Sequence, residues 1–194
     1  SAGRHFILAQ RWPAASCRLS ATLGVMNRVH SQIGVALEKA LGLTLISVEY
    51  MCFPHEVAGA LTANELDGEV ALHFERSVSV RLTWCQVTGW SEVNSLVASP
   101  DSHYKSGTLA SVAANSQQLW APHVGRRLCR IEALGWLGTP AIARLVFASG
   151  SVLVGVGTES GFRDGDCIIV RPDTAMWLQS GGEATPLWST SNDA

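Results

Sequence analysis

Charged residues are scarce in this sequence, and lysine is almost absent. Asp, Glu, Lys and Arg make up 15% of the 194 residues, and Lys39 and Lys105 are the only lysines. The formal net charge is −2, so the chain lacks the basic surplus with which proteins neutralise nucleic-acid phosphates. We therefore expect no nucleic-acid partner.

Long apolar runs are also missing. No stretch approaches the roughly 18 uninterrupted apolar residues that a membrane-spanning helix needs, so we expect no membrane partner. Hydrophobic residues nevertheless make up 47% of the chain and the mean hydropathy is +0.18, whereas disordered chains are poor in apolar residues. A chain of this length can bury about 70% of its extended surface. The composition therefore predicts one folded domain with its own core.

The cysteines fit none of the common cysteine-based sites. They are Cys17, Cys52, Cys85, Cys129 and Cys167, an odd number without a C-x-x-C pair. This pattern excludes a zinc ribbon and a dithiol redox motif, and the six histidines show no H-x-H or H-x-x-x-H spacing. We expect no metal and no cofactor. Free cysteines in apolar segments are typical of a reducing compartment, which favours a cytoplasmic protein.

The N-terminal arm, residues 1–26, offers an alternative location. No acidic residue occurs before Glu38, and four arginines are spread through the same segment: Arg4, Arg11, Arg18 and Arg28. This composition is typical of an organelle-targeting leader. An ordered arm is the other interpretation, and because the first methionine is Met26, the sequence does not say whether residues 1–25 are native.

Apolar spacing predicts the first two elements. Apolar residues recur at helical spacing from Met26 to Leu41, and Gly42 stands where a helix ends. The apolar, β-branched run 43–51 follows and stops before Pro54, which indicates a strand. After its arm, the chain is therefore predicted to form a helix and then a strand.

Strict alternation over residues 70–84 predicts a β-hairpin. A three-residue loop at 75–77 places Leu72 opposite Val80, so that the apolar side chains of both strands point to one face. A two-residue loop would turn the apolar set of one strand to the other face. The register therefore selects the three-residue loop.

A second hairpin is predicted over residues 143–156. With residues 148–151 as a four-residue loop, Leu145 lies opposite Val154. We expect the alternating side chains of the two hairpins to be buried: Leu72, Phe74, Val80, Leu82, Leu145, Phe147, Val152 and Val154.

The two halves of the chain repeat one pattern. An apolar residue, Gly, Leu, an aliphatic residue and Glu occupy matching places in residues 41–49 and 124–132, 83 positions apart. Each segment is followed by a proline-bearing loop, at Pro54 and Pro140, and then by a hairpin. This repetition indicates an internal duplication in which Pro122 keeps any second helix short.

These elements predict an α+β fold in a single domain, in which internally duplicated helix-strand-hairpin units form mainly antiparallel sheet. The predicted boundaries are residues 27–178 for the domain, about 27–86 and 109–171 for the pseudo-repeats, and 179–194 for a polar C-terminal tail. Because the tail is poor in apolar residues, we expect it to dock loosely.

The duplication places Glu49 and Glu132 at equivalent strand positions. If both carboxylates reach one central groove, they can share acid and base roles, and His55 is a further candidate for catalysis. Each glutamate is otherwise a solvent-facing strand residue or an acceptor for an arginine. The alternative function is accordingly a small-molecule-binding or hydrolytic enzyme with paired carboxylates in a groove between the repeats.

Tryptophan usage favours binding over catalysis. The chain has seven tryptophans and two tyrosines, and Trp90, Trp120 and Trp136 fall outside the alternating core positions. Tryptophan is enriched in protein–protein contacts, although ordinary core packing explains any single tryptophan as well. No nucleophile elbow or phosphate loop occurs. We therefore predict a non-enzymatic binding domain that acts on a protein partner or by self-association, with these three tryptophans as partner contacts.

Overall fold

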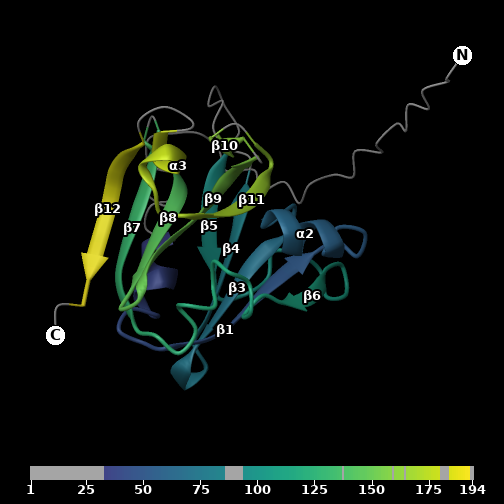
Figure 1. Ribbon diagram of the computed structural model, residues 1–194, viewed down its shortest axis with the longest axis horizontal. Coiled ribbons are helices and arrows are strands. Elements are labelled where there is room, and N and C mark those ends of the chain that lie inside the picture. Colours follow the sequence, from purple (N-terminus) through teal and green to yellow (C-terminus); the bar gives the residue numbers. More distant parts are fainter. Residues whose placement is uncertain are drawn as a thin grey trace, which may run out of the picture.

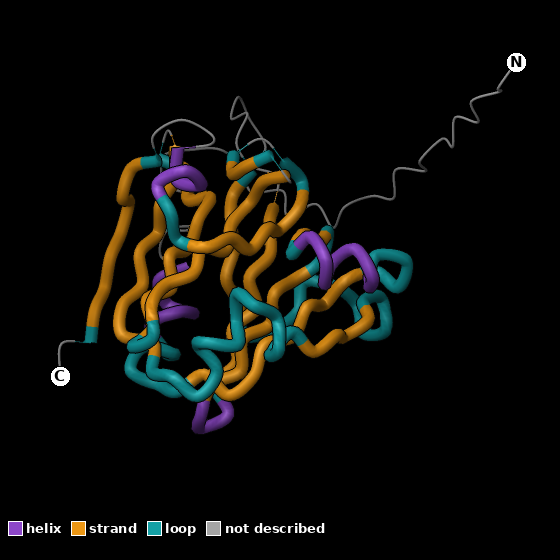
Figure 2. The backbone as a smooth tube through the Cα atoms, in the orientation of Figure 1, coloured by secondary structure: helices purple, strands orange, loops and turns teal. Residues whose placement is uncertain are grey.

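The computed structural model describes residues 33–85, 94–136, 138–158, 160–163, 165–179 and 184–192. They form a β-rich domain of mainly antiparallel sheet (Figure 1), and Figure 2 shows how few of them are helical. None of the described helices is long and apolar enough to cross a membrane. The N-terminal arm and Trp90 lie outside the described residues.

The first sheet has five antiparallel strands in the order β5-β4-β3-β1-β6. They are β1 (Leu45–Cys52), β3 (Glu69–Phe74), β4 (Ser79–Cys85), β5 (Ser95–Ser99) and β6 (Ala110–Ala113). A 3-10 turn, η1 (Glu75–Ser77), joins β3 to β4, and the helix α2 (Val57–Ala63) follows β1 in the chain. The strand predicted at 43–51 is therefore β1, and it lies inside the sheet.

The second sheet has the order β12-β7-β8-β9-β11-β2, with β10 paired to β9. Its longer strands are β7 (Leu128–Trp136), β8 (Thr139–Phe147), β9 (Gly150–Thr158), β11 (Cys167–Pro172) and β12 (Thr185–Ser191). The strands β2 (Glu65–Leu66) and β10 (Gly161–Phe162) have two residues each. The helix α3 (Ala175–Gln179) links β11 to β12 and lies over the upper end of this sheet in Figure 1.

The two sheets pack face to face around one core. Alternation turns Val48 of the first sheet and Val154 of the second inward, and both are fully buried in the same cluster. The helical residues 33–38, part of the predicted first helix, add Leu37 to it. All eight side chains predicted for the core are buried, so this prediction is confirmed.

A second, smaller apolar cluster covers the outer face of the second sheet. Trp136, Leu153 and Phe162 are buried there, and Trp177 and Leu178 of α3 pack against them. α3 therefore adds a third layer to the domain. Only 7% of Trp136 is exposed, which removes this residue from the candidate partner contacts.

The first hairpin has the predicted register. Leu72 pairs with Val80, and η1 supplies the three-residue loop. The Phe74 N–H donates to the Val78 carbonyl at 2.8 Å and closes that loop. The prediction is therefore confirmed, and the three-residue loop turns the apolar sets of both strands toward the core, which a two-residue loop would not do.

The predicted register of the second hairpin is wrong by two residues. Leu145 pairs with Val152 instead of Val154, and the loop is a two-residue turn at 148–149. A shift of two keeps every side chain on its face, so alternation cannot distinguish these registers. Gly150 favours the tighter loop, since its φ of 132° is a conformation that other residues rarely adopt.

Residues 185–191 form β12, where composition suggested a loosely docked tail. β12 pairs antiparallel with β7 along its length. The ring of Trp188 lies 3.5 Å from the position that a Cβ on Gly34 would take, so β12 also contacts the N-terminal helix. Serine and threonine dominate this strand. Because they do not alternate with apolar residues, the sequence pattern does not predict a strand here.

The two halves of the chain exchange matching backbone hydrogen bonds. The Leu45 N–H donates to the Arg126 carbonyl at 3.0 Å, and the Leu128 N–H donates to the Leu43 carbonyl at 2.9 Å. Leu45 and Leu128, like Leu43 and Arg126, stand 83 positions apart. The two bonds therefore join equivalent positions of opposite halves.

The glycines of the repeated pattern take part in the same exchange. The Gly42 N–H donates to the Leu128 carbonyl and the Gly125 N–H to the Leu45 carbonyl, both at 2.8 Å. Their φ angles are 79° and 78°, in the left-handed region that favours glycine. A glycine is thus needed at the same place in each half.

Strand registers match between the halves as well. Val48 pairs with Leu72, and Ile131, 83 positions after Val48, pairs with Leu145, 73 positions after Leu72. Each pairing is preceded by a bulge early in β1 or β7. Within the described residues, however, the second half has hydrogen-bonded turns at 117–125 in place of a helix, as expected from the proline in this segment.

Phe74→Ala and Phe147→Ala should each lower the free energy of unfolding by about 3–5 kcal/mol, because each removes a buried ring from the common core. Denaturant titrations measure the change. Val35→Ala is the control: this helical side chain is 56% exposed, so the change should stay within about 0.5 kcal/mol. Unfolding free energies equal to that of the unmodified chain for both phenylalanine variants would contradict this core.

Candidate binding site

A cavity of about 620 Å³ opens where the turns at 117–125 meet β9, β11 and the two short helices. Leu119, Val152 and Val170 supply apolar walls, and Gln118 and Ser151 supply polar groups. The cavity is wide and open to solvent. Its size falls within the range of ligand-binding pockets, which are typically apolar with a few convergent polar groups.

The end of α2 forms one wall of the cavity. α2 stops at Asn64, whose left-handed φ of 52° lets its N–H donate to the Ala60 carbonyl. The Asn64 side-chain oxygen Oδ1 accepts a hydrogen bond from the Tyr50 hydroxyl at 2.7 Å, and that hydroxyl accepts one from Trp120 Nε1 at 2.9 Å. This chain of hydrogen bonds ties the wall to the core.

The same chain accounts for Trp120. Its side chain is fully buried, with the indole N–H donating to Tyr50, so Trp120 is a core residue and does not offer a partner contact. Burial, against a smaller opposing effect of the hydrogen bond from Trp120, raises the pKa of Tyr50 and keeps its hydroxyl neutral. Sequence position did not reveal this role because the donor and acceptor are 70 residues apart.

Arg171 holds the adjoining part of the wall in place. Its Nη1 donates to the carbonyls of Ala63 and Asn64 at 2.9 and 3.3 Å, and its guanidinium lies 4.8 Å from the centre of the Trp177 ring. Arg171 is 7% exposed, and Nη2 lies 3.8 Å from a carboxylate oxygen of Glu65. These contacts join α2, β11 and α3 around the cavity.

His123 is an uncharged part of the cavity wall. Its Nδ1 lies 2.8 Å from the Ser149 hydroxyl, and its ring stacks on Phe147 with centroids 4.9 Å apart. Burial lowers the pKa of His123, so the imidazole is neutral at pH 7. The wall around it therefore presents apolar surface and hydrogen-bonding groups without adding a charge.

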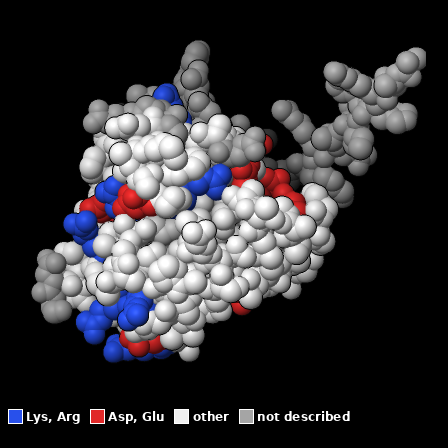
Figure 3. Space-filling view, in the orientation of Figure 1, with Lys and Arg blue, Asp and Glu red and all other residues white. Residues whose placement is uncertain are grey.

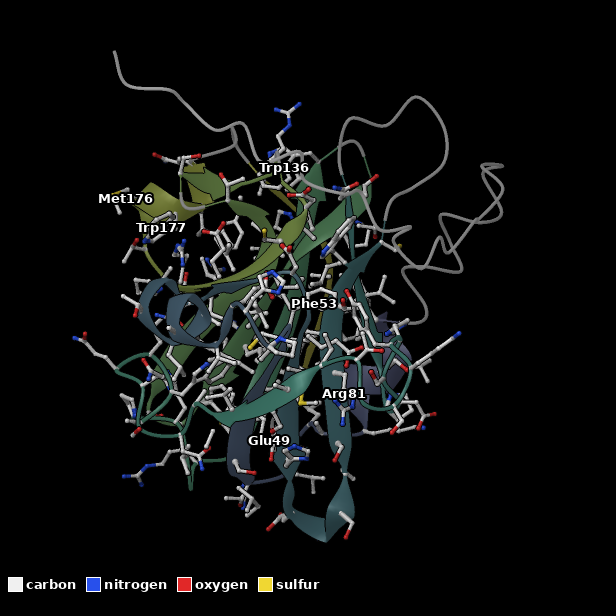
Figure 4. All side chains as sticks on the ribbon, turned by 90° about the vertical axis from the view of Figure 1, so that its right-hand side faces the viewer. Glu49, Phe53, Arg81, Trp136, Met176 and Trp177 are labelled. Carbon is white, nitrogen blue, oxygen red and sulfur yellow. The ribbon has the colours of Figure 1, made fainter. Side chains whose placement is uncertain are left out.

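The structure does not bring Glu49 and Glu132 into one groove. Glu49 projects from the outer face of the first sheet (Figure 4), where its Oε2 accepts a hydrogen bond from the Ser111 hydroxyl at 2.7 Å. Glu132 belongs to the second sheet and binds Arg144 at 2.7 Å and Arg130 at 3.3 Å. Neither carboxylate lines the cavity.

Glu132 is instead part of an ion-pair network. Arg144 also lies 3.0 Å from Asp173, which accepts a hydrogen bond from the Ser151 hydroxyl at 2.6 Å. The network runs across β7, β8 and β9 and ends at the cavity, because Ser151 is one of the lining residues. Glu132 is therefore a structural acceptor, the second of the two roles left open by the sequence.

His55 contacts an aromatic side chain. It stacks on Phe53 with ring centroids 6.0 Å apart, and Phe53 in turn makes an edge contact with Tyr104. Burial and the nearby Glu56 carboxylate raise the pKa of Cys52, which disfavours a thiolate nucleophile. His55 and Cys52 thus show no arrangement of a nucleophile and its base.

Sequence reasoning missed a Ser-His-Glu set on the outer face of the first sheet. His73 Nδ1 lies 2.9 Å from the Ser79 hydroxyl, and His73 Nε2 lies 3.9 Å from Glu49. These residues come from three adjacent strands, so neighbouring register brings them together. They lie on an open sheet face and not on the cavity wall, so no enclosed substrate site accompanies them.

Glu69, also missed, is a fully buried carboxylate that anchors a loop. Its oxygens accept hydrogen bonds from the His103 N–H at 2.7 Å and from Arg81 at 3.3 Å. Burial raises its pKa, but the hydrogen bonds from His103 and Ser102 and the charge of Arg81 outweigh burial and hold the pKa of Glu69 below its usual value. Its position at the start of an alternating strand gave no sign of this role.

Among the residues that the structure describes, no three His, Cys, Asp or Glu side chains are grouped so that they could hold a metal ion.

The Cys167 thiol donates a hydrogen bond to Asp67 at 2.9 Å, and burial together with that carboxylate raises the pKa of the thiol. Cys167 and Asp67 are therefore a hydrogen-bonded pair that stabilises the fold.

Comparisons with protein-family models, with curated proteins and with solved structures found no match.

Glu69→Gln should remove an acid-sensitive part of the stability. Because the pKa of Glu69 is lower in the folded chain than in the unfolded chain, its ionised form stabilises the fold fully at pH 7. This contribution is lost as the pH falls below about 4.3, the ordinary glutamate value. The substitution should lower the free energy of unfolding by about 1.5–3 kcal/mol at pH 7 and flatten its dependence on pH below 4.3.

Urea titrations between pH 7 and pH 3 measure both effects. Glu38→Gln, at an exposed glutamate of the N-terminal helix, is the matched control and should change the free energy of unfolding at pH 7 by no more than about 0.5 kcal/mol. An equal loss of stability on acidification in Glu69→Gln and in the unmodified chain would contradict the role of Glu69.

Proposed function

We propose that this chain is a non-catalytic binding domain that receives an apolar side chain of a protein partner in the cavity beside α3. The observation that carries this proposal is the cavity itself. Its apolar walls are held by polar groups that already have partners within the domain, notably the half-buried Asn64 and the buried Arg171. A site of this kind is preformed, so little ordering is needed when a ligand binds.

The arrangement of reactive groups supports binding over turnover. Glu132 is engaged by two arginines, His123 stacks on a core phenylalanine, and the pKa values of Cys52 and Cys167 are raised. Catalysis needs a nucleophile and a base within hydrogen-bond reach at a site that holds the substrate. The cavity wall offers hydrogen bonds and apolar surface, which are sufficient for recognition.

The surface beside the cavity supports a protein partner. Met176 of α3 is 67% exposed, and Figure 4 shows it at the outer margin of the domain next to Trp177, a cavity residue. Uncharged atoms make up most of the face in Figure 3, with charged residues in small groups. An exposed methionine beside an open apolar site is typical of surfaces that bind polypeptides.

Gln118→Trp should block the site. Gln118 is exposed on the rim, so an indole there can fill the cavity without disturbing the core. The probe is a peptide selected on the immobilised, unmodified protein from a random library and required to carry an apolar anchor residue. Fluorescence anisotropy should show that the substitution raises the Kd of this peptide at least tenfold.

Ser116→Trp is the matched control, because Ser116 is an exposed residue of the same segment that does not line the cavity. Its Kd should equal that of the unmodified protein. Equal peptide binding by Gln118→Trp and the unmodified chain, or selections that return no binding peptide, would contradict the proposed function.

The internal duplication is the second part of the proposal. The reciprocal hydrogen bonds, the equal φ angles of Gly42 and Gly125 and the matching strand registers support it, because a shared ancestry of the halves accounts for all three. The cavity then combines both halves, since Asn64 comes from the first and His123 from the second.

Replacing residues 121–127 with the residues of 38–44 should give a folded chain with cooperative unfolding, because the two segments form equivalent turns. Circular dichroism during thermal unfolding measures this. The control replaces 121–127 with residues 37–43, which moves the glycine away from position 125, where a positive φ is required. Equal unfolding of both chimeras, or a disordered first chimera, would contradict the equivalence of the turns.

A further inference from the structure

Asn64, in the cavity wall, has one polar group that the rest of the domain does not use. Its backbone N–H donates to the Ala60 carbonyl, and its own carbonyl accepts from the Val170 N–H at 2.9 Å and from Arg171 Nη1 at 3.3 Å. Its side-chain oxygen Oδ1 accepts from the Tyr50 hydroxyl. Among the described residues, no acceptor lies within hydrogen-bond distance of the side-chain nitrogen Nδ2, which can donate two hydrogen bonds.

The hydrogen-bond chain from the core fixes the orientation of the Asn64 amide. An indole N–H can only donate, so the Tyr50 oxygen accepts from Trp120 and the proton of Tyr50 points to Asn64. Burial raises the pKa of Tyr50, so the hydroxyl keeps this proton at pH 7. The atom of Asn64 that meets the proton must be an acceptor, which is Oδ1. Rotating the amide by half a turn would bring two donors together, so Nδ2 stays on the side away from Tyr50.

Nδ2 is therefore an oriented donor in a wall that is otherwise largely apolar. Val170, whose N–H donates to Asn64, and Val152 on the neighbouring strand β9 belong to the same wall. An apolar group that fills the cavity covers this donor and removes water from it. The free energy lost in this way is recovered only if the ligand supplies an acceptor beside its apolar group.

The charges of the wall indicate that this acceptor is neutral. Arg171 is the only charged side chain among the described residues of the wall. Its Nη1 donates to the carbonyls of Ala63, Asn64 and Val170, and its Nη2 lies 3.8 Å from Glu65. A carboxylate or phosphate would lose its hydration without meeting an unpaired positive charge. A carbonyl oxygen avoids this cost and still accepts from Nδ2.

We infer that Asn64 Nδ2 donates to a main-chain carbonyl of the partner, next to the apolar side chain that enters the cavity; this inference rests on the function proposed above. A polypeptide carries a neutral carbonyl on every residue, so the anchor residue supplies both groups at once. Carbonyls inside a helix already accept from their own chain, which favours an extended segment of the partner. Asn64 is then a specificity-determining residue that selects peptides over hydrocarbon ligands without an acceptor.

A coupling experiment on the selected peptide tests this inference. Each peptide bond in turn is replaced by an (E)-alkene, which keeps the extended geometry and removes the carbonyl. For the unmodified chain, one replacement beside the anchor residue should raise the Kd about tenfold. In Asn64→Asp, the same replacement should not raise the Kd, because the carboxylate still accepts from Tyr50 but has no N–H to donate.

Gln179→Glu is the matched control. It makes the same change from amide to carboxylate at an exposed residue of α3 that does not line the cavity, so the tenfold effect of the alkene should persist. Aspartate tolerates the left-handed φ of 52° at position 64, so Asn64→Asp should retain the fold, as its Tm would show.

Nuclear magnetic resonance of the unmodified chain gives a second measurement that does not depend on any variant folding. The side-chain amide protons of Asn64 should shift when the peptide binds, and unchanged resonances would overturn the inference. A bound peptide without an alkene-sensitive bond, or with equal sensitivity in Asn64→Asp, would overturn it and leave the proposed function standing. Selections that return no binding peptide would overturn both.

Discussion

Two backbone turns that hydrogen-bond to each other connect the two sheets of this domain. The turn at 42–45 leads into β1 and the turn at 125–128 leads into β7, and each donates to carbonyls of the other. A β-bridge between Thr44 and Arg127 lies between these bonds. Because both turns are fixed by the same contacts, neither sheet can move without breaking hydrogen bonds at the start of the other.

The core depends on this contact between the two turns, which we call the crossing. Five residues before the glycine of each turn stands a fully buried side chain, Leu37 in the first half and Trp120 in the second. Trp120 then donates to Tyr50 of β1, so the crossing places an indole of one half over a strand of the other. The cavity lies beside this contact, since Asn64 both accepts from Tyr50 and lines the wall.

The cavity exists where the two halves differ. α2 follows β1 and ends at Asn64, whereas β7 passes to β8 through a short connection, so the second half has no helix at the corresponding place. The proline at position 122 stands in a segment of turns where the first half is helical. The first half therefore has helical residues at two places where the second half has turns or a short connection, and the cavity lies between these unlike segments.

The alternation of apolar and polar residues predicts which face of a strand is buried, and it therefore predicted the part of this fold that depends on that face. It located the core and the register around Leu72, where a one-residue slip would expose an entire apolar set, but it did not separate registers two residues apart around Leu145. β12 was missed because strand pairing with β7, and not apolar periodicity, orders its hydroxyl residues. Buried polar groups such as Glu69 and Arg171 were missed because their partners lie far away in sequence.

Burial of the two described tryptophans leaves the cavity as the feature of this domain that favours binding. Tryptophan is large and apolar, so a sequence with many of them must either cover them internally or present them to a partner. Trp120 is covered by the core, and Trp136 belongs to the outer cluster against which α3 packs. Trp177 and Leu178 of α3 pack against that cluster and Trp177 also lines the cavity, whereas the neighbouring Met176 is 67% exposed. The same packing that removes two predicted contacts therefore creates the apolar surface on which the proposed partner would bind.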